Sequence, residues 1–427
     1  MSVDIKNLPA KGSWHCYVHK LRAWVGGDDG LPVRPYLMLV VSTEDGKFLS
    51  CEPGDTVETA LGGNVCKTEP TTEMVLFFLK RVMTHPKQIN AASGGEKLAP
   101  HRPTTIKFAD TKTAALHLGE QDKWGSVTAC PYVVGCKDEL KKLGIDQATF
   151  APVPPMFLEN IIRGSIEPGM APENVEYGTQ HLPGLLECTE GFTPEFGKSL
   201  YAAAAAYVRA APWESLAARR PIQVTYRLVL REDVSMKLTA FGSVVGSKEL
   251  GSYGFSIHKT IESAMTAYEL EHTGENDDEA NAMAAGGQTC MFTSVYETPF
   301  EDVDNKELHG WELAAGDEKD AAPDEENWPL FCKIQFEAGE NGAQDTLALT
   351  RPAIIELQCF ELMFKGIVEL LNSGELKSSG DTVRDAKGPW TVKCASAAGS
   401  ENGETADVEL EISLPALTTG DAGGTFL

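Results

Sequence analysis

The 427-residue chain contains no apolar run of the roughly 18–20 residues that a membrane-spanning helix needs. Its first residues, Met-Ser-Val-Asp-Ile-Lys, lack the apolar core of a secretory signal. They also lack the Arg- and Ser-rich amphipathic pattern of an organelle presequence. We therefore expect no signal, transit or transmembrane segment, no membrane association, and a location in the cytoplasm or the nucleus.

Basic residues are scarce. The 37 Lys and Arg residues are outnumbered by 62 Asp and Glu residues, which gives a formal net charge of −25. A nucleic-acid backbone would on average be repelled by this charge, so nucleic acid is disfavoured as a partner.

Paired cysteines and histidine clusters are missing as well. None of the ten cysteines forms a C-x-x-C pair, so a zinc-ribbon spacing is absent. Several lie in apolar runs, such as Cys332 and Cys359, which indicates buried thiols in a reducing compartment. His15 and His19 share one face of a predicted strand, but two ligands are too few for a catalytic zinc.

Apolar residues make up 42% of the chain, enough for the cores of two domains. The first domain is expected over 12–163. Strand patterns occur at 14–18, in a hairpin over 35–50, and at 104–108 and 147–150, and helical patterns begin at Thr71 or Thr72 and at Thr111. The continuous apolar run at 36–41 predicts a strand covered on both faces, and the alternation of elements predicts an α/β domain.

Residues 164–192 are rich in Gly, Pro and Glu, and we predict a linker there. The second domain is expected over 193–416 as an α+β domain. A helix begins at Thr193 as the N-cap with Pro194 in its first turn, a second apolar helix spans 352–371, and a third begins near Ile261. Strands are predicted at 222–230, 236–241, 253–258, 289–296, 330–336, 390–394 and 408–414.

Two acidic stretches, 269–280 and 297–327, interrupt the second domain. Runs of like charge are typical of solvated loops, and a docking surface for a basic partner is the alternative. We predict a flexible tail over 417–427.

The sequence contains one incomplete phosphate-binding motif and one incomplete nucleophile motif. Gly197-Lys198-Ser199 resembles the end of a phosphate-binding loop, but it lies inside the helix that begins at Pro194 rather than before a helix. Position 258, where a nucleophile elbow needs glycine, is His258. Neither motif supports a nucleotide site or a hydrolase.

The order of elements over 33–163 resembles the ribonuclease-H-like core of integrases and transposases. In that fold, acidic residues on the first strand, after a later strand and on a late helix hold two metal ions that activate water. Asp110 and Glu159 match the second and third positions, whereas Ser42 stands at the first. Asp45 and Glu44 are the candidate substitutes, although the turn at Glu44-Asp45-Gly46 is typical of a hairpin.

The whole chain, over about 12–372, also resembles a group of uncharacterised bacterial and algal proteins defined by a domain of unknown function. The resemblance rests on the segments 34–41, 143–145, 202–213, 241–242 and 253–255. It implies a fold and no particular activity. The expected fold class is therefore a ribonuclease-H-like α/β domain followed by an acidic α+β domain.

Three functions remain open. The leading hypothesis is a non-catalytic binding or adaptor protein with a protein partner and no cofactor, because no catalytic set is complete. The second is a metal-dependent phosphodiesterase or nuclease in which Asp110, Glu159 and Asp45 hold Mg or Mn. The third is a small-molecule site at the domain interface, since such sites need no linear motif.

Overall fold

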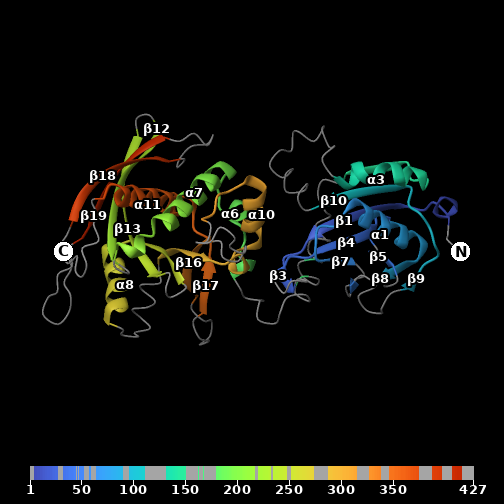
Figure 1. Ribbon diagram of the computed structural model, residues 1–427, viewed down its shortest axis with the longest axis horizontal. Coiled ribbons are helices and arrows are strands. Elements are labelled where there is room, and N and C mark those ends of the chain that lie inside the picture. Colours follow the sequence, from blue (N-terminus) through green and yellow to red (C-terminus); the bar gives the residue numbers. More distant parts are fainter. Residues whose placement is uncertain are drawn as a thin grey trace. The chain divides into compact units, whose positions relative to one another are not determined.

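The structure is a computed structural model of the 427-residue chain (Figure 1). It describes residues 4–26, 32–44, 46, 48–51, 57–58, 64–89, 96–110, 131–150, 162, 167, 179–216, 220–231, 234–247, 252–273, 287–314, 327–337, 346–374, 387–396 and 406–415. Within these ranges helices and mixed sheets occur together, so the chain has a mixed α/β class. None of the described helices is long and apolar enough to cross a membrane.

The chain divides into two compact units, Met1–Glu176 and Tyr177–Leu427. The division falls inside the expected linker over 164–192. The later part of that range does not behave as a linker, because residues 179–192 include the short helix α6, Leu185–Cys188, and the buried Leu185 and Phe192 of the second unit's core.

The described part of the first unit contains a nine-stranded sheet built around β1, Ser13–Lys20. On one side of β1 lies the antiparallel β4, Tyr36–Ser42, and on the other side the parallel β10, Thr105–Asp110. The path continues through β11, Gln147–Phe150, beyond β10. Beyond β4 it passes through β5, Phe48–Cys51, β8, Pro86–Ile89, and β9, Glu96–Lys97, while β7, Asn64–Cys66, pairs with β4 and with β6, Val57–Glu58.

Both faces of the centre of this sheet are buried, as the continuous apolar run at 36–41 predicted. Trp14, Cys16 and Val18 belong to a core that also contains residues of α1, Thr72–Thr84, and α3, Pro131–Lys142. Tyr17, Leu37 and Leu39 belong to a smaller core on the opposite face.

The helix predicted at Thr71 or Thr72 is confirmed. The Thr71 hydroxyl accepts a hydrogen bond from the Met74 backbone N–H at 3.3 Å and begins α1. The helix predicted over 111–118 lies outside the described residues. We did not predict α3, because Gly135 and its charged residues weaken its pattern. The structure explains this glycine, since a Cβ there would lie 2.7 Å from the Thr72 side chain of α1.

The second unit contains an eight-stranded antiparallel sheet within its described part, in the order β17-β16-β15-β14-β13-β12-β19-β18. The predicted strands are confirmed within a few residues, and only β17 was missed. The bounds are β12 Pro221–Arg231, β13 Val234–Ser247, β14 Ser252–His258, β15 Gln288–Thr293, β16 Trp328–Glu337, β17 Thr346–Thr350, β18 Lys387–Ser396 and β19 Ala406–Leu414.

A separate two-stranded sheet in the first unit pairs β2, Val25–Gly26, with β3, Pro32–Val33.

Helices cover both faces of this sheet. On one face α7, Pro194–Ala210, packs beside α11, Ile354–Asn372, over the core that contains Phe255 and Ile257 (Figure 1). On the other face, where strand alternation places Ser256 and His258, lies α8, Ile261–Thr273. All three helices were predicted, and the Thr193 hydroxyl caps α7 as expected.

The expectation of solvated acidic loops was wrong for the described part of 297–327. These residues form α10, Phe300–His309, in which Phe300, Val303 and Asp302 are buried, followed by the buried Trp311. The error arose because the charged residues of α10 masked its few buried apolar positions. In the other stretch, residues 269–273 belong to α8, and residues 274–280 lie outside the described residues, as does the tail over 417–427.

Candidate functional site

The predicted metal-ligating residues are only partly covered by the structure. Asp110 is the last residue of β10, and its Cα pairs in parallel register with that of Val18 on β1. Asp45 and Glu159 lie outside the described residues. Their convergence with Asp110 therefore stays a prediction.

The position assigned to Ser42 needs a correction. Ser42 ends β4 and pairs with Trp14, whereas Asp110 pairs with Val18, four positions further along β1. At roughly 3.3 Å per residue this separates Ser42 and Asp110 by about 13 Å along the strand. The strand that lies beside Asp110 is β1, over 13–20, and not β4, over 36–42, because β1 lies between β4 and β10 in the sheet.

One face of β1 carries His15, Tyr17 and His19, as strand alternation predicted for the two histidines. The Tyr17 hydroxyl lies 3.0 Å from His15 Nδ1, and the two rings meet edge to face. Burial and, to a smaller extent, the charge of Lys107 on β10 lower the pKa of His15. The His15 imidazole is therefore neutral at pH 7, and it does not supply a cation to this face.

His19 lies beside a carboxylate that the sequence did not reveal. The buried Glu167 accepts a hydrogen bond from the Arg22 backbone N–H at 2.8 Å and lies 3.9 Å from His19 Nε2. Burial alone would raise the pKa of Glu167, but hydrogen bonds from His19 and Arg22 and the charge of Arg22 lower it to about 2. The Glu167 carboxylate is thus ionised, and it already interacts with Arg22 and His19.

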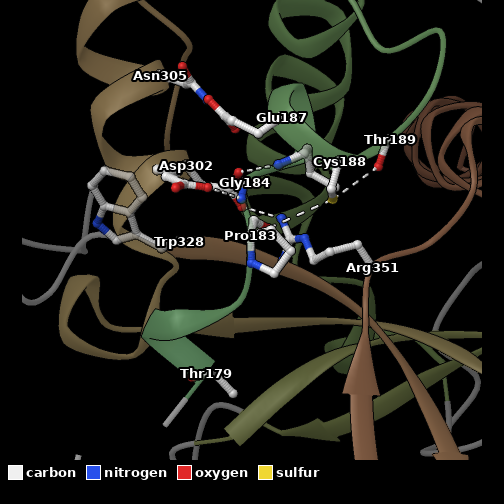
Figure 2. Close-up of polar contacts among 12 residues, drawn as sticks. Thr179, Pro183, Gly184, Glu187, Cys188, Thr189, Asp302, Asn305, Trp328 and Arg351 are labelled. Atoms are coloured by element: carbon white, nitrogen blue, oxygen red, sulfur yellow. Dashed lines mark hydrogen bonds and ion pairs between the residues drawn. The ribbon is translucent and has the colours of Figure 1, made fainter. Parts of the chain in front are cut away.

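A second polar cluster joins α6 to α10 in the second unit (Figure 2). Two carboxylates of α10 accept hydrogen bonds from the start of α6: Glu301 from the Gly184 N–H at 2.7 Å, and Asp302 from the Leu185 N–H at 2.8 Å. These N–H groups are ones that a helix leaves without a partner of its own. Glu301 and Asp302 of α10 therefore face inward and bind α6.

Asp302 also forms an ion pair with Arg351, and both side chains are almost wholly buried, with 0% and 3% of their area exposed. Burial raises the pKa of Asp302, and the neighbouring Arg351 guanidinium opposes this rise. The pair connects α10 to the segment between β17 and α11, so it links elements about 50 residues apart in the sequence, at positions 302 and 351.

The edge of this cluster is formed by Glu187, Cys188 and Asn305 (Figure 2). The Asn305 amide donates to both Glu187 carboxylate oxygens, at 3.0 and 3.1 Å. Desolvation of the Glu187 carboxylate and repulsion from Glu301 and Asp302 raise its pKa. Burial likewise raises the pKa of the Cys188 thiol, so Cys188 is not an activated nucleophile.

Ser199, from the incomplete phosphate-loop motif, lies in the middle of α7 as expected. Its hydroxyl donates to the buried Glu361 of α11 and accepts a hydrogen bond from Lys365 Nζ at 3.0 Å. Lys365 Nζ also donates to Glu361 at 2.7 Å and to the Ala395 carbonyl at 2.6 Å. Lys365 Nζ donates to all three of these partners, so it is not arranged as a base for Ser199, and the group joins α7, α11 and β18 instead.

Among the residues that the structure describes, no group of three or more His, Cys, Asp or Glu side chains is arranged to hold a metal ion. No family model matches the chain, and searches of the curated proteins and of the solved structures found no significant match. The resemblances to the ribonuclease-H-like fold and to the group of uncharacterised proteins therefore stay predictions.

The sequence did not reveal Glu167, Asp302 or Arg351, which make buried polar contacts. Their partners lie 145 and 49 residues away along the chain, so no local spacing connects them. The one sequence feature that could have drawn attention to Arg351 is its position directly before Pro352, where the predicted helix over 352–371 begins.

Proposed function

We propose that this protein is a non-catalytic binding protein that contacts another protein, and that its first unit has a ribonuclease-H-like fold. The strand order supports the fold: β1 is central, the antiparallel β4 and β5 follow on one side, and the parallel β10 and β11 lie on the other. The helices α1 and α3 precede β10 and β11 in the sequence, which agrees with this arrangement.

The observation that carries the non-catalytic assignment is the composition of β1. A two-metal site of this fold needs a carboxylate on the central strand to bridge both ions. The residues of β1 are Ser-Trp-His-Cys-Tyr-Val-His-Lys, without Asp or Glu, and the Cα partner of Asp110 is the buried Val18. An isopropyl group at this position offers no metal ligand.

The assignment to protein binding is supported by the helical layer of the first unit. Phe77 on α1 and Val134 on α3 are the most exposed large apolar side chains of the described residues, at 60% and 62%. Both helices contribute to the same core, so both lie on the same face of the sheet. Exposed aromatic and aliphatic side chains on one face are typical of a surface that a protein partner covers.

The reduced thiols support a location in the cytosol or nucleus. Every cysteine whose side chain the structure describes is free, and most of these thiols are buried.

The partner is expected to be lost when the apolar surface is made polar. Full-length wild-type protein and the Phe77→Ser/Val134→Ser double variant would be used as baits in native lysate, and the bound proteins quantified by mass spectrometry. We expect at least one stoichiometric partner of the wild type to fall about tenfold or more with the double variant, since losing two central apolar contacts costs roughly 2 kcal/mol.

Ile355→Ser is the matched control, because Ile355 is 40% exposed on α11 of the second unit. It should retain the partner. Equal recovery with wild type and the double variant, or a wild-type protein that binds nothing, contradicts the proposal.

The second candidate function, a metal-dependent phosphodiesterase, is favoured by the position of Asp110 at the end of a strand parallel to β1. A manganese titration by calorimetry, beside hydrolysis assays on single- and double-stranded nucleic acids, separates the two functions. The non-catalytic proposal predicts neither saturable heat nor cleavage for the wild type or Asp110→Asn. Binding and cleavage that are both lost in Asp110→Asn would establish the second candidate in its place.

A further inference from the structure

A buried arginine of the second unit has no anionic partner among the residues that the structure describes. Arg220 immediately precedes β12 and has only 2% of its area exposed. Its Nη2 donates to the Pro415 carbonyl at 2.6 Å. Its Nε and Nη1 atoms, which are both buried, have no hydrogen-bond partner in the part of the chain that the structure describes.

The second unit contains another buried guanidinium, that of Arg351, and the charge of Arg351 is paired. Arg351 is ion-paired with the buried Asp302, which compensates its charge. No carboxylate of the described residues forms an ion pair with Arg220, and its Nη2 donates to a neutral carbonyl. An uncompensated buried charge costs several kcal/mol, and an arginine in a protein does not deprotonate to avoid this cost.

The surroundings of Arg220 also disfavour its positive charge. Burial lowers the pKa of Arg220, and the Tyr268 side chain on α8 acts against this only in part. A cation destabilised by burial binds an anion strongly, because the pairing restores the solvation that burial removed.

The strands β13 and β14 supply neutral polar groups on the side of β12 that they cover. Pro221, next to Arg220, pairs with Ser243 on β13, which pairs in turn with Ser256 on β14. The Ser243 hydroxyl lies 2.9 Å from that of Ser256 and 3.4 Å from His258 Nε2. The helix α8 contacts β12, β13 and β14.

We infer that Arg220 anchors a binding site for a small oxyanion, a carboxylate or phosphate group, at the start of β12 beneath α8. The planar guanidinium is the side chain best suited to such groups, since its N–H donors match the spacing of two oxygens. The inference concerns the second unit alone and does not depend on the proposed protein-binding function.

The test is the anion dependence of thermal stability in the full chain. Melting would be followed at fixed pH and ionic strength while sodium chloride is replaced stepwise by inorganic phosphate or by acetate. The wild type should show a saturable rise in Tm of about 5 °C or more with at least one of the two anions. A rise with phosphate alone assigns a phosphate group, and a rise with acetate assigns a carboxylate.

Arg220→Met keeps the volume of the side chain and removes its charge. We expect this variant to have a higher Tm than the wild type in chloride alone, and to lose the response to the anions. Arg209→Met is the matched control, because Arg209 is 53% exposed in a surface ion pair with Glu312. It should respond as the wild type does.

Three results overturn the inference. They are a wild-type Tm that is independent of both anions, an equal response in Arg220→Met, and the absence of saturable heat when phosphate and acetate are titrated into the wild type by calorimetry. The calorimetric titration uses the wild type alone, so it decides the matter even if Arg220→Met does not fold.

Discussion

Replacing Asp302 with asparagine is expected to lower the free energy of unfolding of the second unit by about 3–5 kcal/mol. The substitution keeps an oxygen that can accept from the Leu185 N–H, and it removes the charge that compensates Arg351. The loss is large because both side chains are buried, so water cannot replace the missing carboxylate. Chemical denaturation followed by tryptophan fluorescence measures the effect.

Two further variants isolate the cause. Glu307→Gln, on the exposed side of the same helix, should change the unfolding free energy by no more than about 0.5 kcal/mol. The Asp302→Leu/Arg351→Met double variant removes both charges and should recover most of the stability that Asp302→Asn loses, since apolar replacements of a buried pair are often neutral. If Asp302→Asn unfolds like the wild type, the ion pair does not hold α10 in place.

Truncating Trp311 to alanine is expected to cost about 3–5 kcal/mol of unfolding free energy, measured by urea denaturation. The Trp311 ring is buried with its centroid 4.7 Å from that of Tyr201, and its indole N–H donates to the Pro194 carbonyl at 3.1 Å. A Cβ at Gly197 of α7 would lie 2.4 Å from the ring. The absence of a side chain at Gly197 therefore gives the Trp311 ring room to pack against α7.

Glu312→Ala is the control for this variant, because Glu312 is the next residue and is 52% exposed. Its surface ion pair should contribute less than about 1 kcal/mol. A small effect of Trp311→Ala, similar to that of Glu312→Ala, would restore the interpretation of residues 297–327 as a solvated loop.

These two variants also bear on how a binding surface should be tested. Deleting residues 297–327 would remove Asp302 and Trp311 together with α10, so loss of a partner after that deletion would report unfolding. Point substitutions at Phe77 and Val134 avoid the problem, since neither side chain is buried.

Local sequence patterns were sufficient for most elements of the two sheets and for α1, α7, α8 and α11. Each of these follows from a short-range rule: a capping hydroxyl such as Thr193, an apolar run, or alternation along a strand. The mixed α/β class follows from the same rules. The helices α3 and α10 were missed because charged residues and Gly135 outnumber their few inward apolar positions.

The candidate site shows the limit of this approach. The order of elements placed Asp110 at the end of a strand, and β10 confirms that position. The order did not show which strand lies beside it, because pairing depends on register between segments more than 90 residues apart, at positions 18 and 110. For the same reason Ser42 was assigned to a position that β1 occupies.

The sequence by itself determined the net charge, the two-unit size, the strand and helix periodicities, and the absence of a carboxylate from residues 13–20. Only the tertiary structure decided that these residues form the central strand, that Asp302 faces Arg351, and that Arg220 is buried without a carboxylate among the described residues. The physical reason is that periodicity reports which side of an element faces inward. Compensation of a buried charge depends on a partner that folding brings from elsewhere in the chain.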